Sequence, residues 1–363
     1  GEPRLIEHPQ VSNFPYWLMD NTLPDHNTWL PFNDSGGALH TDGFFPRKRN
    51  LAAHVFALAA RRTQDPTLNW YLHEIVRGPS SDIFGLLYYE PDLPLREPIA
   101  NNTLIRMQPP QGWLDLLPAC TSIPSGHAET AVGADRLAVH YPTQGVVIAR
   151  TGFGPEDMLL AFKGGWAVRG HDHVDRNSLV LYDGTVPILI ETGPGPYDDP
   201  DFDMHFGSFH AHSTLQVDGE IRHHGTPVSG HEGVERLPDG SLRIVGDASA
   251  SYPTLSLFCR TLLLHLPERI AITDKIRPAD DVPHALAFGF HTPASARLAD
   301  GVVVIPGRQS NWRLYSPDKG LVWSEEALGG EGSEHRKAFV ARTTLLATET
   351  TYRFVLERWP AIS

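Results

Sequence analysis

Three short stretches hold the residues whose types and spacing could do chemistry. They are residues 169–178 (RGHDHVDRNS), 190–195 (IETGPG) and 211–214 (AHST). Among them, His173, Glu191 and His212 offer two imidazoles and one carboxylate, a set that suits Zn²⁺ or a similar divalent ion with one position left for water or for structural closure. The sequence therefore predicts a divalent metal site at these three residues, with Zn²⁺ as the first expectation and Mn²⁺ or Ca²⁺ as alternatives.

The elements around these stretches have the pattern of short strands. Residues 180–182 and 187–190 are β-rich runs separated by an Asp-Gly pair that is typical of a hairpin turn. Residues 215–217 form a third run that ends at another Asp-Gly pair. Neighbouring strands lie roughly 4.8 Å apart, and side chains of one parity share a face, so a hairpin and a returning strand would bring the three predicted ligands together.

His171 precedes His173 by two positions, so on a regular strand both imidazoles would point to the same face. One could then bind the metal while the other faces a substrate. The alternative is that these are ordinary surface histidines, because the chain contains 19 of them and a lone H-x-H is a weak pattern. The nearby carboxylate and third histidine favour the metal site.

The order H-x-H-x-D-x-x-S, apolar strand, acid-x-G, then A-H-S-T resembles the heparinase II/III-like superfamily of polysaccharide lyases. The resemblance runs from about Leu104 to the C-terminus, and more loosely over residues 17–91. It implies that His173, Glu191 and His212 hold a structural metal at the floor of a cleft. It also implies that His171 lines the catalytic part of that cleft.

The chain departs from the family pattern at several positions. The acid is Glu191 where the family more often has Asp, Ser213 replaces the usual Asn, and an Arg frequently found before the last histidine is absent around Gly207. A Glu at the acid position also resembles the related uronyl epimerases. The resemblance therefore leaves the reaction open between elimination and epimerisation.

The lyase resemblance implies β-elimination on a polysaccharide that contains uronic acid. The carboxylate of the sugar is neutralised, a base removes the adjacent proton, and the glycosidic oxygen leaves, which yields a 4,5-unsaturated uronate. His171 suits this work because the imidazole pKa lies near neutrality. The two alternatives are a uronyl C5-epimerase, which returns the proton, and a non-catalytic carbohydrate-binding or structural subunit.

Two further residues are candidates for substrate binding. Arg150 ends an apolar strand at a position where the family commonly has Arg, and a guanidinium can bind a carboxylate through two parallel hydrogen bonds. A structural ion pair is the alternative for Arg150. Tyr197 lies on the loop after Glu191 and could contact a sugar ring, or it could simply pack. Asp175 could orient an imidazole or cap a turn.

The sequence predicts an α+β multidomain chain: the C-terminal helices of an (α/α) toroid over residues 1–98, a Pro-rich linker over 99–118, and a large antiparallel β-sandwich over 119–363. Asn50 is the expected cap of a helix over residues 50–62, and Asp65 is the expected cap of the next one. The toroid assignment rests on the resemblance of residues 30–37 to a segment that precedes the last helix pairs in these lyases.

Residues 1–98 are too few for a closed toroid, and the Tyr and the Asn or His that act with the equivalent of His171 precede this segment in the family. We therefore expect the chain to be the C-terminal part of a longer enzyme, completed by its own N-terminal segment or by a homo-oligomer. A secreted or periplasmic location is expected for such an enzyme, and the N-terminal segment that would show it is expected to precede Gly1.

Composition excludes some partners. The net charge of −13 argues against nucleic-acid binding, and no apolar run approaches the roughly 20 residues of a membrane-spanning helix. The expected partner is an anionic polysaccharide or oligosaccharide, which a local group of Arg and His in a cleft can attract despite the overall charge. Cys120 and Cys259 are too few for a disulfide scaffold.

Overall fold

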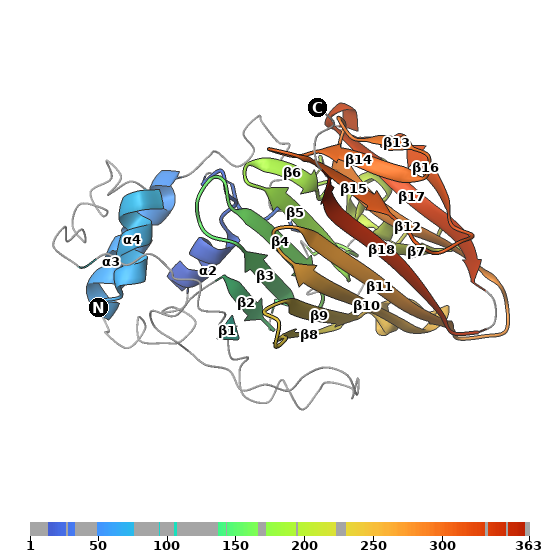
Figure 1. Cartoon of the computed structure of the whole chain (residues 1–363), viewed down its shortest axis with the longest axis horizontal. Coiled ribbons are helices and arrows are strands. Elements are labelled where there is room, and N and C mark those ends of the chain that lie inside the picture. The colour runs from blue at the N-terminus through green and yellow to red at the C-terminus, as the bar shows by residue number, and fades with distance from the viewer. Residues whose placement is uncertain are drawn as a thin grey trace.

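The computed structural model describes residues 14–26, 28–32, 49–75, 94, 105–106, 137–142, 144–165, 172–193, 195–222, 230–330, 333–345 and 348–359. Over these residues the chain is mostly antiparallel β-sheet with a few helices (Figure 1). The predicted β-rich architecture is therefore confirmed. The toroid expectation concerns residues 1–98, which are described only in part, and it stays a prediction.

Within the described ranges the strands form three sheets, and their order across each sheet is as follows. The six-stranded sheet contains β1 (Ile105–Arg106), β2 (Ala138–Tyr141), β3 (Val146–Arg150), β4 (Met158–Lys163), β5 (Ser178–Asp183) and β6 (Val186–Leu189). The eight-stranded sheet contains β13 (Arg297–Ala299), β14 (Val302–Pro306), β15 (Asn311–Tyr315), β18 (Thr350–Trp359), β11 (Arg269–Pro278), β10 (Leu255–His265), β9 (Leu242–Asp247) and β8 (His231–Arg236). The four-stranded sheet contains β16 (Val322–Glu326), β17 (Arg336–Leu345), β12 (His284–Pro293) and β7 (Leu215–Val217).

Strand sequences show which sheet is covered on both faces. Every residue of β3, β4 and β5 is buried, and these strands are almost uninterrupted apolar runs. Strands β10 and β11 alternate between buried and more exposed positions, as expected for strands with one face toward solvent.

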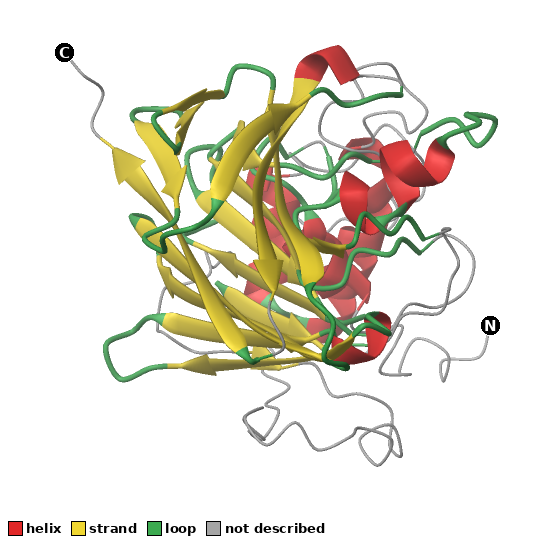
Figure 2. Ribbon diagram, turned by 90° about the vertical axis from the view of Figure 1, so that its right-hand side faces the viewer, coloured by secondary structure: helices red, strands yellow, loops and turns green. Residues whose placement is uncertain are grey.

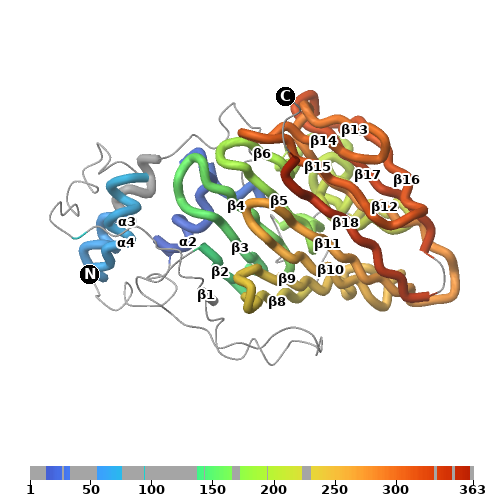
Figure 3. The backbone as a smooth tube through the Cα atoms, in the orientation of Figure 1, coloured from blue at the N-terminus to red at the C-terminus, as the bar shows by residue number. Residues whose placement is uncertain are grey.

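The chain can be followed in Figure 3 from the blue helices through the green six-stranded sheet to the orange and red strands.

The main core lies between the eight-stranded sheet and a layer made by the six- and four-stranded sheets. Phe162, Phe258, Phe288 and Phe354 come from four strands of the three sheets and are all fully buried in this core. Burying an aromatic side chain of this size stabilises the fold by roughly 1.5–3 kcal/mol. A backbone hydrogen bond of 3.0 Å from the Ile190 N–H to the carbonyl of a β12 residue joins the six- and four-stranded sheets.

The second face of the six-stranded sheet is covered by residues from the N-terminal part of the chain. Leu23, Leu30 and Phe32 pack there against residues such as Ile148 and Val180. Helix α2 (Phe14–Asn21) leads into this segment and lies beside β2, β3 and β4 (Figure 1). The six-stranded sheet is therefore an inner layer, with the sandwich core on one side and the α2 segment on the other.

The remaining helices pack on one another beyond this layer (Figure 2). Helix α3 (Arg49–Thr63) begins one residue before Asn50, so the prediction that Asn50 is the helix cap is wrong. Asp65 does cap α4 (Pro66–Trp70) by accepting a hydrogen bond from the Thr67 N–H, and a π-helical turn, η2 (Tyr71–Ile75), continues it. No helix in the described ranges is long and apolar enough to cross a membrane.

The expected linker over residues 99–118 is described only at β1, which pairs in parallel with β2. The linker region therefore contributes at least this short strand to the six-stranded sheet. Strands β8 and β9 were not expected from the sequence, although Asp239 and Gly240 mark the tight turn between them.

His284 is held between two carboxylates at the start of β12. Its Nδ1 lies 2.7 Å from Asp218 Oδ2 and its Nε2 lies 2.9 Å from Asp280 Oδ1, so both ring nitrogens can donate only if the ring is an imidazolium. The hydrogen bond with Asp218 raises the pKa of His284 above its ordinary value of 6.5, against the opposing effect of burial.

We expect this clamp to stabilise the protein in a pH-dependent way. A raised folded-state pKa gives stability that is fully present below the unfolded pKa and is lost as pH rises through the folded pKa. The loss of unfolding free energy in His284→Ala should therefore be larger near pH 6 than near pH 9, measured by denaturant unfolding. An equal loss at both pH values would contradict the charged clamp.

Candidate functional site

The structure brings His173, Glu191 and His212 together where the six- and four-stranded sheets meet. The His173 and His212 rings have centroids 5.3 Å apart, and His212 Nδ1 is in hydrogen-bond contact with Glu191 Oε2. All three side chains are buried. The site thus contains two imidazoles and a carboxylate that are shielded from water.

The prediction that regular neighbouring strands place these three side chains on one face of a sheet is wrong. Residues 172–177 form bends and turns rather than a strand, and Glu191 lies just after β6 ends. His212 follows the 3-10 turn η5 (Phe209–Ala211) and precedes β7, which pairs with β12 in the four-stranded sheet. Strand parity therefore says nothing about His171, which lies outside the described residues.

Each oxygen of the Glu191 carboxylate has a partner. Ser178 donates its hydroxyl hydrogen to Oε1, and His212 occupies Oε2. If His212 donates from Nδ1, its Nε2 has a lone pair, and this buried atom has no hydrogen-bond partner among the described residues. A buried imidazole nitrogen without a partner is unusual. Because Nε2 points away from Glu191, a single ion bound by both residues requires the Nδ1–Glu191 contact to change.

The donor set fits a divalent ion by its chemistry. His173 and His212 supply imidazole nitrogens, Glu191 supplies oxygens, and Ser178 fixes the carboxylate in the way that outer groups orient metal ligands. As they stand, however, no three His, Cys, Asp or Glu side chains in the described ranges are grouped as a ready metal site. The metal assignment therefore stays a proposal.

A buried ionic network holds the loop that contains His173. Lys163 Nζ lies 2.7 Å from Asp172 Oδ1 and 2.9 Å from Asp175 Oδ2. Arg176 Nη2 lies 2.9 Å from Asp172 Oδ1 and 2.7 Å from Asp175 Oδ1. Burial alone would raise the pKa of Asp175, but Lys163 and Arg176 outweigh it and hold that pKa well below its ordinary value.

This network also fixes the backbone of the loop. Arg176 donates to the carbonyl oxygens of Gly164, at 2.7 Å, and His173, at 3.2 Å. Asn177 adopts a left-handed backbone with φ of 62°, and its amide donates to the carbonyl of Gly246 in β9 at 3.2 Å. The loop from 172 to 177 is therefore anchored to both facing layers, and so is the backbone at His173.

A second buried ion pair anchors the other side of the site. Arg260, on β10, makes two hydrogen bonds of 2.7 Å to the carboxylate of Asp274 on β11. Its Nη1 also donates to the carbonyl oxygens of Asn177, at 2.8 Å, and Ser213, at 2.9 Å. One fully buried guanidinium thus joins the loop after His173 to the loop around His212.

His291 is a site neighbour that sequence reasoning missed. Its Nε2 lies 3.0 Å from the carbonyl oxygen of His210, and its backbone N–H donates to Ser213 Oγ at 3.0 Å. Burial, followed by the nearby His210 and His212, lowers the pKa of His291 well below 6.5, so its ring is neutral near pH 7. A histidine at the end of the apolar run 285–290 was the one signal for it.

Arg150 is buried where α2 meets the six-stranded sheet. Its guanidinium donates to the backbone carbonyls of Asp20 and Thr22 and lies 4.3 Å from the centre of the Phe153 ring. Burial lowers its pKa from the ordinary value. These contacts favour a structural role for Arg150, because its guanidinium donates to the backbone of the last turn of α2 and of the residue that follows the helix.

Tyr197 remains accessible, whereas Asp175 does not. Tyr197 is 58% exposed, and its ring stacks on Phe202 with centroids 5.5 Å apart. The rings of Phe202 and His173 are perpendicular, with centroids 6.3 Å apart. Asp175 pairs with Lys163 and Arg176 and so belongs to the ionic network, and its role as an orienting partner of an imidazole stays a prediction.

The family model described as "Heparinase II/III-like, C-terminal" matches residues 134–356. This range includes the three sheets except β1 and the last three residues of β18, together with His173, Glu191, His212 and their ionic anchors. The chain belongs to the heparinase II/III-like family. A search of curated proteins found no match.

Solved structures agree with this family assignment at the level of the fold. The crystal structure titled heparinase III has a TM-score of 0.66 and 13% identity, over 99% of this chain and 49% of that one. Heparan sulfate lyase HepC from Pedobacter heparinus has a TM-score of 0.65 and 14% identity, over 97% and 47%. The chain therefore spans about half the length of these heparinase-like structures.

Proposed function

We propose that this heparinase II/III-like chain is the C-terminal part of a polysaccharide lyase that cleaves a uronic-acid-containing polysaccharide by β-elimination. The observation that supports this best is the buried group of His173, Glu191 and His212, held between two ionic anchors inside the family domain. Such rigid support is what a site needs if it must hold a reacting group in place. We place the enzyme outside the cell or in the periplasm.

The proposed roles follow from position and chemistry. His173, Glu191 and His212 would hold a divalent ion, which supplies a fixed positive charge and closes the loops that meet there. His171 takes up or donates a proton, or stabilises negative charge on the sugar, two positions from the anchored His173. Tyr197 offers an exposed aromatic face to a sugar ring.

The second candidate is uronyl C5-epimerisation, which the Glu at position 191 favours. Both reactions begin by removing the same proton, and they differ in whether the glycosidic bond then breaks. A non-catalytic carbohydrate-binding subunit is the third candidate, because the chain covers only about half of the lyases that it resembles.

One experiment separates the three. A polypeptide that contains this whole chain is incubated with heparan sulfate, hyaluronan and alginate, in heavy water and in ordinary water. A lyase produces the ultraviolet absorbance of an unsaturated uronate, whereas an epimerase incorporates deuterium at C5 without that absorbance. Binding of a polysaccharide with neither change would reject both enzyme proposals.

The metal proposal makes a direct prediction. Purified protein should contain a stoichiometric divalent ion by elemental analysis, and His173→Ala should lose it. Removal of one ligand leaves a buried carboxylate without its ion, so the melting temperature should fall by about 5 °C or more.

His205→Ala is the matched control. His205 is half-buried and bonded to Asp199 at 3.0 Å, outside the proposed ligand group, so this variant should retain the ion. Wild-type protein without a bound ion, or full metal content in His173→Ala, would contradict the metal site.

A further inference from the structure

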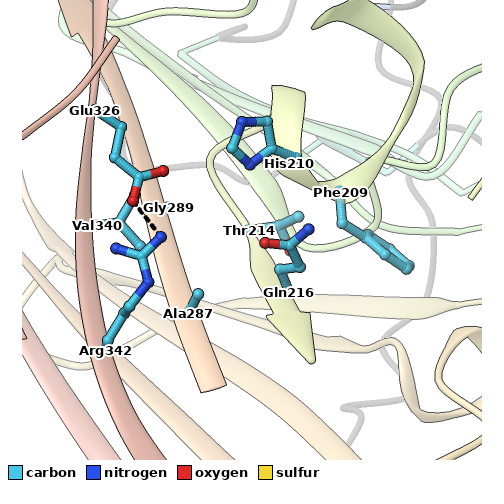
Figure 4. Close-up of a pocket in the computed structure, with 9 residues that line it drawn as sticks. All are labelled: Phe209, His210, Thr214, Gln216, Ala287, Gly289, Glu326, Val340 and Arg342. Atoms are coloured by element: carbon cyan, nitrogen blue, oxygen red, sulfur yellow. Dashed lines mark ion pairs between the residues drawn. The ribbon is translucent and has the colours of Figure 1, made fainter. Parts of the chain in front are cut away.

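The outer face of the four-stranded sheet contains a shallow hollow that the proposed site does not use. Its enclosed part has a volume of about 10 Å³, which is room for about one water molecule, so a larger ligand would lie across it. Its lining includes His210, Gln216, Ala287, Gly289, Glu326 and Arg342 (Figure 4).

The floor of the hollow exists because β12 has small residues on its outer face. Ala287 and Gly289 alternate with Leu286, Phe288 and Phe290, whose side chains fill the sandwich core. Strand β12 is central in its sheet and pairs with β7 on one side and β17 on the other. Larger side chains at the two small positions would fill the space between the neighbouring strands.

The two walls are polar and complementary. Figure 4 shows His210 and Gln216 on one side and the Glu326–Arg342 ion pair on the other. Arg342 is further fixed by a hydrogen bond of 2.7 Å from Nη1 to Ser324 Oγ. The walls therefore present donors and acceptors in fixed positions.

The charge of the walls selects the kind of ligand. Glu326 and Arg342 neutralise each other, so neither a free anion nor a free cation is favoured. A carboxylate accepts, a guanidinium donates and an amide does both, and this combination suits a hydroxyl group.

We propose that this hollow binds one pyranose ring of a carbohydrate chain, with a hydroxyl group entering the hollow and the apolar face of the ring over Ala287 and Gly289. The loop of residues 208–213 supplies His210 to the hollow and His212 to the proposed metal group. The hollow is thus a subsite beside the proposed catalytic region. This inference rests on the proposed function only in taking the sugar to be part of the substrate.

Filling the hollow tests the proposal. Ala287→Leu places a larger side chain on the floor, and Ala285→Leu is the control, because Ala285 is exposed on the same face of β12 and does not line the hollow. The variants are made in a polypeptide that contains the whole chain. Binding of cellohexaose and of a heparan sulfate hexasaccharide is measured by calorimetry, the latter in a His171→Ala background to prevent cleavage.

The wild type should bind at least one probe, Ala287→Leu should weaken that binding at least about tenfold, and Ala285→Leu should change it less than twofold. Gln216→Ala, which removes a wall donor without touching the core, should also weaken binding. Equal affinities of wild type, Ala287→Leu and Gln216→Ala, or no binding of either probe, would overturn the subsite. Since binding is measured without turnover, failure of β-elimination alone leaves the result intact.

Discussion

His171→Ala should lower the rate of unsaturated-uronate formation at least about 100-fold in the complete enzyme, while the fold and the metal content stay unchanged. A positioned acid, base or charge-stabilising group contributes on this scale. His171 lies two positions before His173, whose backbone is bonded to Arg176 at 3.2 Å in the ionic network. The rate is measured by ultraviolet absorbance, with circular dichroism and elemental analysis of the same sample.

His205→Ala controls for the loss of any nearby histidine and should keep most of the activity. Full activity of His171→Ala would remove this residue from the mechanism. Loss of metal from His171→Ala would show instead that it is a ligand, and the assignments of His171 and His173 would then have to be exchanged.

Arg260→Met should cost about 3–5 kcal/mol of unfolding free energy, the usual effect of removing one partner of a buried ion pair. The change leaves the carboxylate of Asp274 buried without its two hydrogen bonds of 2.7 Å. It also releases the carbonyls of Asn177 and Ser213, on the two loops that flank the proposed metal group. Denaturant unfolding at neutral pH measures the cost.

Two variants separate the buried charge from the general effect of losing an arginine. Arg260→Met combined with Asp274→Leu removes both charges and should recover a large part of the lost stability. Arg353→Met breaks the exposed pair with Asp318, at 61% exposure of the arginine side chain, and should have little effect. A double variant as unstable as Arg260→Met would show that the hydrogen bonds to the two loops, rather than the unpaired carboxylate, determine the cost.

Local patterns were sufficient for much of the β architecture. Residues 180–182 and 215–217 were expected to be strands, and each range lies in one. Sheet membership could not be read in the same way, because it depends on contacts between distant residues. Leu215 pairs with Phe288 on β12, 73 positions later in the chain, rather than with the preceding hairpin.

For the candidate site, too, local sequence patterns predicted some features, whereas contacts between distant residues determined the others. Residue types and spacing pointed to His173, Glu191 and His212, which the structure places together. The supporting charges were not found, since Lys163 reads simply as the end of an apolar strand until the fold places Asp175 beside it. Arg150 was ambiguous for the same reason: its partners are backbone carbonyls, which no sequence pattern marks.

The segment that follows α2 covers one face of the six-stranded sheet, and this limits where the protein can be cut into separately folding parts. The matched family segment begins at residue 134, yet Leu23, Leu30 and Phe32 shield the far side of the sheet within it. A cut at residue 134 would therefore run through a hydrophobic core and not between two units. A fragment made in that way would present a contiguous apolar surface to water, so the cooperative folding unit is larger than the segment that sequence similarity delimits.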